Sequence, residues 1–208
     1  MTAYKKSLVA MSLSLVLLAT ACSAPSQSSS SSSSGQLASS QSQSQSQSNS
    51  SSSSASDEPL LGSFTATDLD GNQVDQSIFE NYDLTMINIW GTFCSPCIKE
   101  MPDLGEIHKE YADKKVQVVG IVIDTLDRDG TISASQVEVA KEVVAKTGAD
   151  YLHILPSEDL INLKLYAVNA VPETIFVDST GALVGKSYYG ARSKSDWTKI
   201  INSLLESA

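Results

Sequence analysis

The chain has 208 residues, of which 41% are hydrophobic, and a formal net charge of −10 at pH 7. Such an excess of acidic side chains argues against binding to nucleic-acid phosphates and against electrostatic adhesion to anionic lipid. Residues 59–208 have the mixed composition of a folded domain. Their number suits one domain with its own hydrophobic core.

The N-terminus has the pattern of an export signal. Two lysines precede an apolar run over residues 8–21, and Cys22 follows directly. The run is shorter than the about 20 apolar residues of a membrane-spanning helix. Residues 17–23, Leu-Leu-Ala-Thr-Ala-Cys-Ser, resemble the bacterial lipobox, in which the cysteine is lipidated, although Ala stands where Leu is usual. We expect residues 1–21 to be a lipoprotein signal peptide and Cys22 to carry the lipid; the alternative is an ordinary cleaved signal in which Cys22 has no role.

After this signal, residues 23–56 consist almost wholly of Ser and Gln and contain no charged side chain. Such a segment cannot bury enough apolar surface to offset its chain entropy. As a flexible coil it would have an r.m.s. length of roughly 30 Å. The sequence therefore predicts a lipidated cysteine and disordered tether over residues 22–58, followed by one domain over residues 59–208. The tether is either a leash that lets the domain reach partners or a spacer through a cell wall.

Two cysteines at a predicted helix start suggest redox chemistry. An apolar run over residues 84–89 leads into WGTFCSPC, residues 90–97. A strand, a Gly turn and a CxxC motif in this order are typical of a redox-active pair. Cys94 is expected at the N-cap, where free N–H groups and the helix dipole stabilise a thiolate. Cys97 follows one turn later, and Pro96 suits the first turn because no backbone N–H is needed there. We predict that Cys94 attacks and Cys97 resolves.

Two other roles for the cysteine pair are less favoured. A structural disulfide more often joins distant segments, because short loops gain least from a cross-link. A zinc site needs about four ligands, and the other candidates are Cys22, His108 and His153. Because Cys22 is assigned to the lipid anchor, a complete set of zinc ligands is hard to assemble.

The remaining patterns predict an α/β domain. Residues 68–72, Asp-Leu-Asp-Gly-Asn, favour the turn of a hairpin. A capping box at residues 135–138 marks the start of a helix, and Gly148 marks its end. The order of elements predicts a sheet covered by helices on both faces. In chain order, we expect a hairpin around residues 61–72, a buried strand at 84–90, a helix after Cys97, a strand at 116–123, a helix up to Gly148, a strand at 151–155 that includes His153, a helix capped by Ser157, a strand before residue 178, a strand at 182–189 and a final helix with Trp197 in its apolar stripe.

Three segments together resemble the thioredoxin superfamily and, within it, the membrane-anchored TlpA/ResA group of extracytoplasmic thiol–disulfide oxidoreductases. They are residues 88–97 (NIWGTFCSPC), 99–102 (KEMP) and 171–174 (VPET). The resemblance begins near residue 60 and implies a thioredoxin fold: a central mixed sheet flanked by helices, with an N-terminal hairpin extension and a helical insert. It also implies that Val171–Pro172 is a cis-proline loop that faces the cysteines and pairs its backbone with the substrate chain.

The same resemblance suggests how the second cysteine exchanges its proton. Thioredoxin has a buried Asp where this chain has Asn88, so the usual proton acceptor is absent. The TlpA/ResA group shares this Asn and has a Glu three residues after the second cysteine, matched here by Glu100. A carboxylate one turn from Cys97 can accept or relay its proton and raise its pKa by like-charge repulsion. The alternative is that Glu100 is a solvated helix acid.

The predicted substrate-binding residues lie on the same loops. Trp90 and Phe93 are expected to form an apolar rim beside the attacking cysteine, suited to docking a protein disulfide. Pro96 of the CxxC motif, together with Val171 and Pro172, completes the predicted surface. We predict neither a cofactor nor a bound metal.

The resemblance implies a reductase. Reduced Cys94 would attack a disulfide of an exported protein, and Cys97 would release the product. Apocytochrome c, sporulation proteins and surface methionine sulfoxide reductases are substrates in this group, and a CcdA- or DsbD-like membrane protein would supply the electrons. We expect a lipid-anchored monomer on the extracytoplasmic face of the bacterial cytoplasmic membrane.

Other functions that use a similar motif are less favoured. A disulfide-forming oxidase can use the same CxxC motif, because the reduction potential depends on the whole site. A copper chaperone of the Sco type uses more widely spaced cysteines and a distal histidine, for which His153 is the late candidate. A peroxiredoxin needs Pro-x-x-x-Thr-x-x-Cys, but Ile87 and Gly91 stand at the Pro and Thr positions.

Overall fold

The computed structural model describes residues 59–207. The predicted signal peptide, the lipidation site Cys22 and the tether over residues 22–58 lie outside the described residues. Within residues 59–207, no helix is both long enough and apolar enough to span a bilayer.

A five-stranded mixed sheet forms the centre of the domain, in the order β5-β4-β3-β6-β7. The two middle strands, β3 (Leu84–Trp90) and β4 (Val116–Val122), are parallel, and every residue of both is buried, as their apolar sequences predict. β6 (Glu173–Val177) runs antiparallel to β3, and β7 (Leu183–Tyr189) runs antiparallel to β6. β5 (Leu152–Ile154) pairs in parallel with β4 at the other edge.

The predicted N-terminal hairpin is present, but its strands are short. β1 (Thr65–Thr67) and β2 (Gln73–Asp75) pair in antiparallel fashion. The hairpin lies against β5, because the backbone N–H of Leu69 donates to the carbonyl of His153 (3.1 Å) and that of Leu155 donates to Thr67 (2.8 Å). It therefore covers one edge of the sheet.

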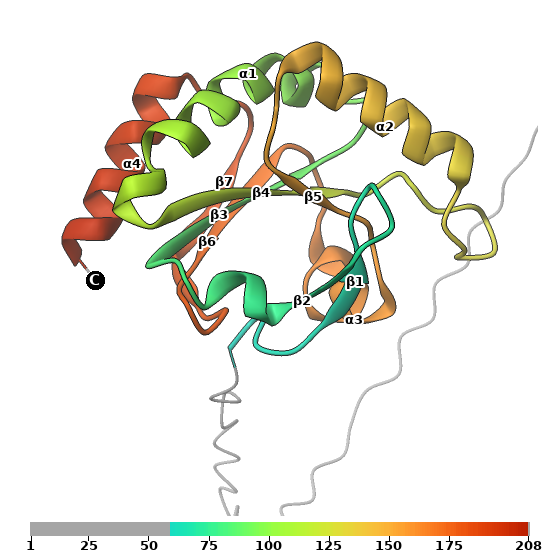
Figure 1. The fold of residues 1–208 in the computed structure, drawn as a ribbon, viewed down its shortest axis with the longest axis horizontal. Helices are drawn as coiled ribbons and strands as arrows, with labels where there is room; N and C mark the ends of the chain where they lie inside the picture. Colours follow the sequence, from blue (N-terminus) through green and yellow to red (C-terminus); the bar gives the residue numbers. More distant parts are fainter. Residues whose placement is uncertain (1–58, 208) are drawn as a thin grey trace, which may run out of the picture. The chain divides into compact units, whose positions relative to one another are not determined.

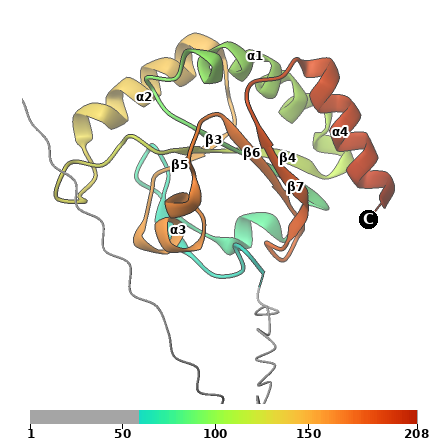
Figure 2. The same ribbon diagram turned by 180° about the vertical axis from the view of Figure 1, so that it is seen from behind.

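Helices cover both faces of the sheet, as the order of elements predicts (Figures 1 and 2). α1 (Ser95–Glu110), α2 (Ala134–Thr147) and α4 (Lys194–Ser207) lie on one face. α3 (Glu158–Leu163) and the N-terminal hairpin lie on the other. Each face has its own hydrophobic core, and both cysteines belong to the core under α1. Three short 3-10 helices complete the domain: η1 (Gln76–Phe79), η2 (Ala112–Lys114) and η3 (Leu165–Ala167).

The predicted capping box of α2 is wrong. The N-cap is Ser133, whose side chain makes no capping bond, so Ser135 lies inside the first turn. The backbone N–H of Ser133 donates to the carbonyl of Thr125 (2.8 Å), and this loop contact starts the helix earlier than the local pattern indicates. The other end is as predicted, because Gly148 adopts a left-handed conformation with φ 66°.

Candidate active site

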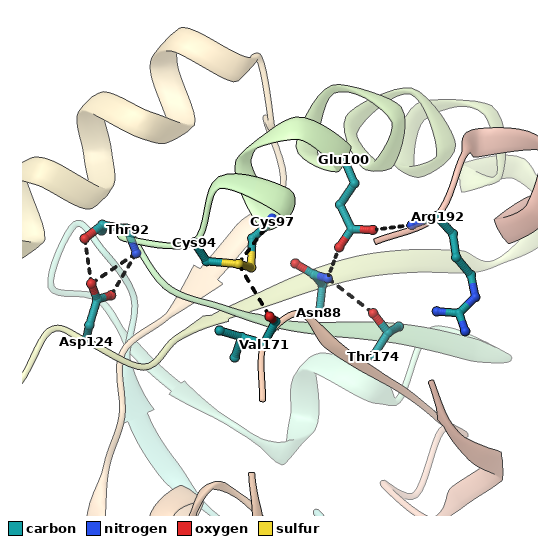
Figure 3. Close-up of a disulfide and its surroundings, with 9 residues drawn as sticks. All are labelled: Asn88, Thr92, Cys94, Cys97, Glu100, Asp124, Val171, Thr174 and Arg192. Carbon is teal, nitrogen blue, oxygen red and sulfur yellow. Dashed lines mark hydrogen bonds between the residues drawn. A yellow bond between two sulfur atoms is a disulfide. The ribbon is translucent and has the colours of Figure 1, made fainter. Parts of the chain in front are cut away.

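The CxxC motif forms a disulfide at the N-terminus of α1 (Figure 3). Cys94 is the N-cap residue, and its sulfur accepts a hydrogen bond from the backbone N–H of Cys97 (3.2 Å). Pro96 lies in the first turn and is exposed. Cys94 is 5% exposed, whereas Cys97 is fully buried. A partner sulfur can therefore approach Cys94 but not Cys97.

Asp124, which the sequence reasoning missed, fixes the loop before the disulfide. Its carboxylate accepts hydrogen bonds from the backbone N–H of Thr92 (3.0 and 3.1 Å) and from the Thr92 hydroxyl (2.6 Å) (Figure 3). The available signal was an acidic residue directly after a buried strand. Parallel neighbours β3 and β4 end at the same edge of the sheet, so Asp124 lies beside the loop that follows β3.

The Val171–Pro172 peptide bond is cis, as the resemblance implied. The carbonyl oxygen of Val171 lies 3.6 Å from the sulfur of Cys94 (Figure 3). The same loop lines an apolar hollow with Phe93 and Ile123. The structure thus brings the predicted cis-proline loop and the CxxC motif together at one surface.

Glu100 is buried, so the alternative of a solvated helix acid is wrong. Its side chain is 3% exposed and accepts three hydrogen bonds: from Asn88 Nδ2 (3.0 Å), from the backbone N–H of Arg192 (3.0 Å) and from Trp197 Nε1 (3.4 Å). Burial raises the pKa of this carboxyl, although the hydrogen bonds partly oppose the shift. The role of Glu100 in moving the proton of Cys97 stays a prediction.

The expected place of Trp90 on the rim is wrong, because this side chain is fully buried. Trp90 is the last residue of β3, and strand alternation directs it under α1 rather than toward the substrate surface. Its indole N–H donates to Nδ1 of His153 (3.2 Å) across Gly120. Phe93, which is 68% exposed, provides the apolar rim without it.

His153 is therefore more than the simple strand residue that the sequence suggested. Its Nε2 lies 3.1 Å from the carbonyl of Ala149, so Nε2 donates while Nδ1 accepts from Trp90. Burial lowers the pKa of His153 to about 4, which keeps the ring neutral near pH 7. Both nitrogens are occupied, which argues against a copper-ligand role. His108 is also a packing residue, and its Nδ1 accepts a hydrogen bond from the backbone N–H of Val118 (3.2 Å).

An ion pair on the opposite face of the sheet was also missed. Lys164 Nζ lies 2.6 Å from a carboxylate oxygen of Glu173, and the two residues are 9% and 0% exposed. Glu173 directly follows Pro172, and Lys164 directly follows α3. The pair therefore joins the two ends of the segment that carries the cis-proline loop. A charged residue at the start of a buried strand was the only sequence signal.

Comparisons with known proteins agree with this fold. Residues 60–186 match the AhpC/TSA family. A protein of Bacillus anthracis named thiol-disulfide oxidoreductase ResA is 29% identical over 122 residues, which are 59% of this chain and 64% of the relative. The ResA protein of Geobacillus kaustophilus is 25% identical over 141 residues, covering 68% of this chain and 74% of its own. The chain thus spans about two thirds or less of the length of several relatives that it matches.

Solved structures show the same fold. A thiol:disulfide interchange protein of the thioredoxin family from Chlorobium tepidum has a TM-score of 0.58 at 23% identity, covering 71% of this chain and 94% of its own. A DsbF homologue from Corynebacterium diphtheriae has a TM-score of 0.54 at 27% identity, covering 70% and 85%.

These likenesses define a thioredoxin-like fold with a mixed central sheet. The chain belongs to the AhpC/TSA family. The predicted fold class and the predicted resemblance to the TlpA/ResA group are both confirmed.

Proposed function

We propose that this protein is a thiol–disulfide oxidoreductase that reduces disulfides of exported proteins. The observation that carries the proposal is the Cys94–Cys97 disulfide at a helix N-terminus, facing the carbonyl of Val171. The helix dipole and the free N–H groups of the first turn stabilise a thiolate at the N-cap. The resemblance to ResA proteins, which carry the name thiol-disulfide oxidoreductase, supports the same activity.

The chemistry proceeds by two thiol–disulfide exchanges. The thiolate of Cys94 attacks one sulfur of the substrate disulfide, the substrate S–S bond breaks, and a mixed disulfide forms with release of one substrate thiolate. The thiolate of Cys97 then attacks Cys94, which releases the second substrate thiolate and leaves the Cys94–Cys97 disulfide. The substrate gains two electrons and two protons. A dithiol protein in the membrane, of the CcdA or DsbD kind, would return the pair to the reduced form.

Glu100 would take part by exchanging a proton with Cys97. The two residues are one turn apart on α1, and a buried carboxyl with a raised pKa is suited to proton transfer. Asn88 holds this carboxyl from the strand below (3.0 Å).

The substrate is proposed to be a protein rather than a small disulfide. Phe93 is exposed beside Cys94, and the apolar hollow next to it includes Val171 of the cis-proline loop. An apolar rim of this kind binds a polypeptide segment next to its cysteine more favourably than it binds a charged small disulfide. Apocytochrome c and surface methionine sulfoxide reductases are candidate substrates, on the strength of the resemblance.

The place of action follows from the N-terminal sequence. A signal peptide over residues 1–21, a lipid on Cys22 and a tether over residues 22–58 would hold a monomeric domain at the extracytoplasmic face of the cytoplasmic membrane. Labelling with a fatty-acid analogue, lost in the Cys22→Ser variant, would establish the anchor.

The reduction potential of the Cys94–Cys97 pair tests the proposal most directly. Equilibration with dithiothreitol or glutathione buffers should give a value nearer to thioredoxin's, about −270 mV, than to DsbA's, about −120 mV. A value near the second would make the protein a disulfide-forming oxidase instead. The Cys97→Ser variant should trap the mixed disulfide with a protein substrate, and the Cys94→Ser variant should not. The absence of any reversible couple would rule out both directions.

Peroxide reduction is the other chemistry to separate from this one. Ile87 and Gly91 replace the Pro and Thr of the peroxide site, so hydrogen peroxide should oxidise the reduced pair no faster than it oxidises an ordinary thiol of similar pKa.

A further inference from the structure

The side-chain carbonyl of Asn88 lies unpaired beneath the redox pair. Asn88 is fully buried in β3, and its Oδ1 has no hydrogen-bond donor within the described part of the chain. A buried carbonyl without a donor is uncommon, because its lost hydration is not replaced. Such an atom calls for a physical explanation.

The orientation of this amide is fixed by its neighbours. Nδ2 donates to Oε1 of Glu100 (3.0 Å) and to the hydroxyl of Thr174 (3.2 Å). The other oxygen of Glu100 is occupied by the backbone N–H of Arg192 and by the indole of Trp197. In its ionised form Glu100 accepts all of these hydrogen bonds, so the amide turns its NH₂ group toward the carboxylate. The carbonyl is left facing the other way.

That other direction is toward the disulfide. Figure 3 shows Oδ1 of Asn88 on the side of the amide that faces the sulfur atoms, with Glu100 on the opposite side. The sequence order agrees, because Cys97 and Glu100 are one turn apart on the same face of α1. Cys97 is itself fully buried. In the disulfide form its sulfur carries no hydrogen and cannot donate.

We propose that Asn88 Oδ1 is the acceptor for the thiol hydrogen of Cys97 in the reduced protein. The proposal rests on the reversible redox chemistry proposed above. A donor dithiol delivers two electrons and two protons, the Cys94–Cys97 bond breaks, and the donor becomes a disulfide. One proton stays on Cys97, whose S–H then donates to Oδ1. Reduction thus gives the unpaired carbonyl its donor.

This contact has two consequences for the redox pair. Because it exists only in the reduced form, it stabilises that form relative to the disulfide and shifts the potential upward. Because it needs the thiol hydrogen, it also favours the neutral form of Cys97 and raises its pKa. The protein would therefore keep Cys97 protonated until the mixed disulfide forms, while Cys94 supplies the attacking thiolate. Asn88 is a positioning residue for the proton of Cys97.

Infrared spectroscopy of the S–H stretch detects the contact without any activity measurement. In a chain with Cys22→Ser and Cys94→Ala, Cys97 is the single thiol, because the sequence has three cysteines. Its band should lie at the lower frequency of a hydrogen-bonded thiol and move to the frequency of a free thiol when Asn88→Leu is added. Thr174→Val is the matched control, because it removes a partner of Nδ2 and leaves Oδ1 in place. A band already at the free-thiol frequency, or one unmoved by Asn88→Leu, overturns the proposal.

The potential provides the second readout. Asn88→Leu should shift the equilibrium with dithiothreitol about tenfold toward the disulfide, which corresponds to a potential about 30 mV more negative. Thr174→Val should shift it less than about threefold. Equal shifts in the two variants would contradict the proposal. A wild-type protein without a reversible couple would instead overturn the proposed function, and the infrared result would still decide whether Cys97 and Asn88 are bonded.

Discussion

Within residues 59–207, each face of the central sheet buries one glutamate, and the two glutamates have different partners. On the face covered by α1, Glu100 accepts hydrogen bonds from an amide, a backbone N–H and an indole. On the face covered by α3, Glu173 lies 2.6 Å from the ammonium group of Lys164. Glu100 lies one helical turn from Cys97 on α1, whereas Glu173 begins strand β6.

Burial alone therefore does not set the role of a carboxyl group. Neutral donors in direct contact leave Glu100 able to take up a proton, and desolvation raises its pKa. A cation in direct contact instead compensates the charge of Glu173 and holds its side chain in place. We interpret the α1 face as built for proton exchange and the α3 face as built to hold the loop that carries Pro172.

The largest expected effect comes from breaking the ion pair. Lys164→Met leaves Glu173 buried without its cation and should lower the free energy of unfolding by about 3–5 kcal/mol. Urea denaturation followed by circular dichroism measures the loss. The double variant Lys164→Met/Glu173→Leu should recover most of it, because no uncompensated charge remains.

An exposed pair supplies the control for this experiment. Lys146 and Glu142 are 2.9 Å apart on α2, and both side chains are mostly exposed. Lys146→Met should change stability by less than about 1 kcal/mol. A Lys164→Met loss as small as this would contradict the structural role of the buried pair.

The second effect tests how tightly the α1 face is packed. A Cβ atom at Gly120 would lie 2.3 Å from Nδ1 of His153 and 3.0 Å from Nε1 of Trp90. Gly120→Ala should therefore destabilise the protein by about 1–3 kcal/mol through overpacking. In a His153→Ala background the same substitution should be markedly less harmful, so the two changes should not be additive. Additive losses in thermal unfolding would show that His153 does not limit the space.

Features that depend on neighbouring residues in the sequence could be predicted. The strands at Leu84–Trp90 and Val116–Val122 were predictable because continuous apolar runs are decided locally. The N-cap position of Cys94 was predictable because it depends on the residues that directly follow. The cis peptide bond before Pro172 was predictable only from the family resemblance.

Long-range polar pairs could not be predicted in the same way. The sequence neighbours of Trp90 predict a place on the rim, but the strand turns its side chain toward His153, which lies 63 residues away in sequence. The contact between Thr92 and Asp124 spans 32 residues. Such partners depend on sheet register, which a single sequence does not specify.

The stability of the protein should depend on pH through Glu100. Its folded-state pKa is raised, so the folded protein binds a proton more tightly than the unfolded chain does. This contribution to stability is present at low pH and is lost as the pH rises from the unfolded value of 4.5 toward the raised pKa. Glu100→Gln should remove that loss, so the stability of wild type relative to the variant should fall across this window. Chemical denaturation at several pH values measures it, and parallel curves would contradict the raised pKa.

The smallest effect on stability is expected at the exposed rim residue Phe93. Phe93 is 68% exposed, so Phe93→Ser should change the unfolding free energy by less than about 0.5 kcal/mol. If its ring docks a protein substrate, the loss of about 1 kcal/mol of apolar contact should raise KM about fivefold. The reduction potential should stay unchanged, because the ring does not contact the buried polar groups around Glu100. Val139→Ser on α2, also at an exposed apolar residue, should alter neither KM nor potential. If the reduction potential changed while KM did not, the docking role of Phe93 would be contradicted, and its ring would instead influence the redox pair.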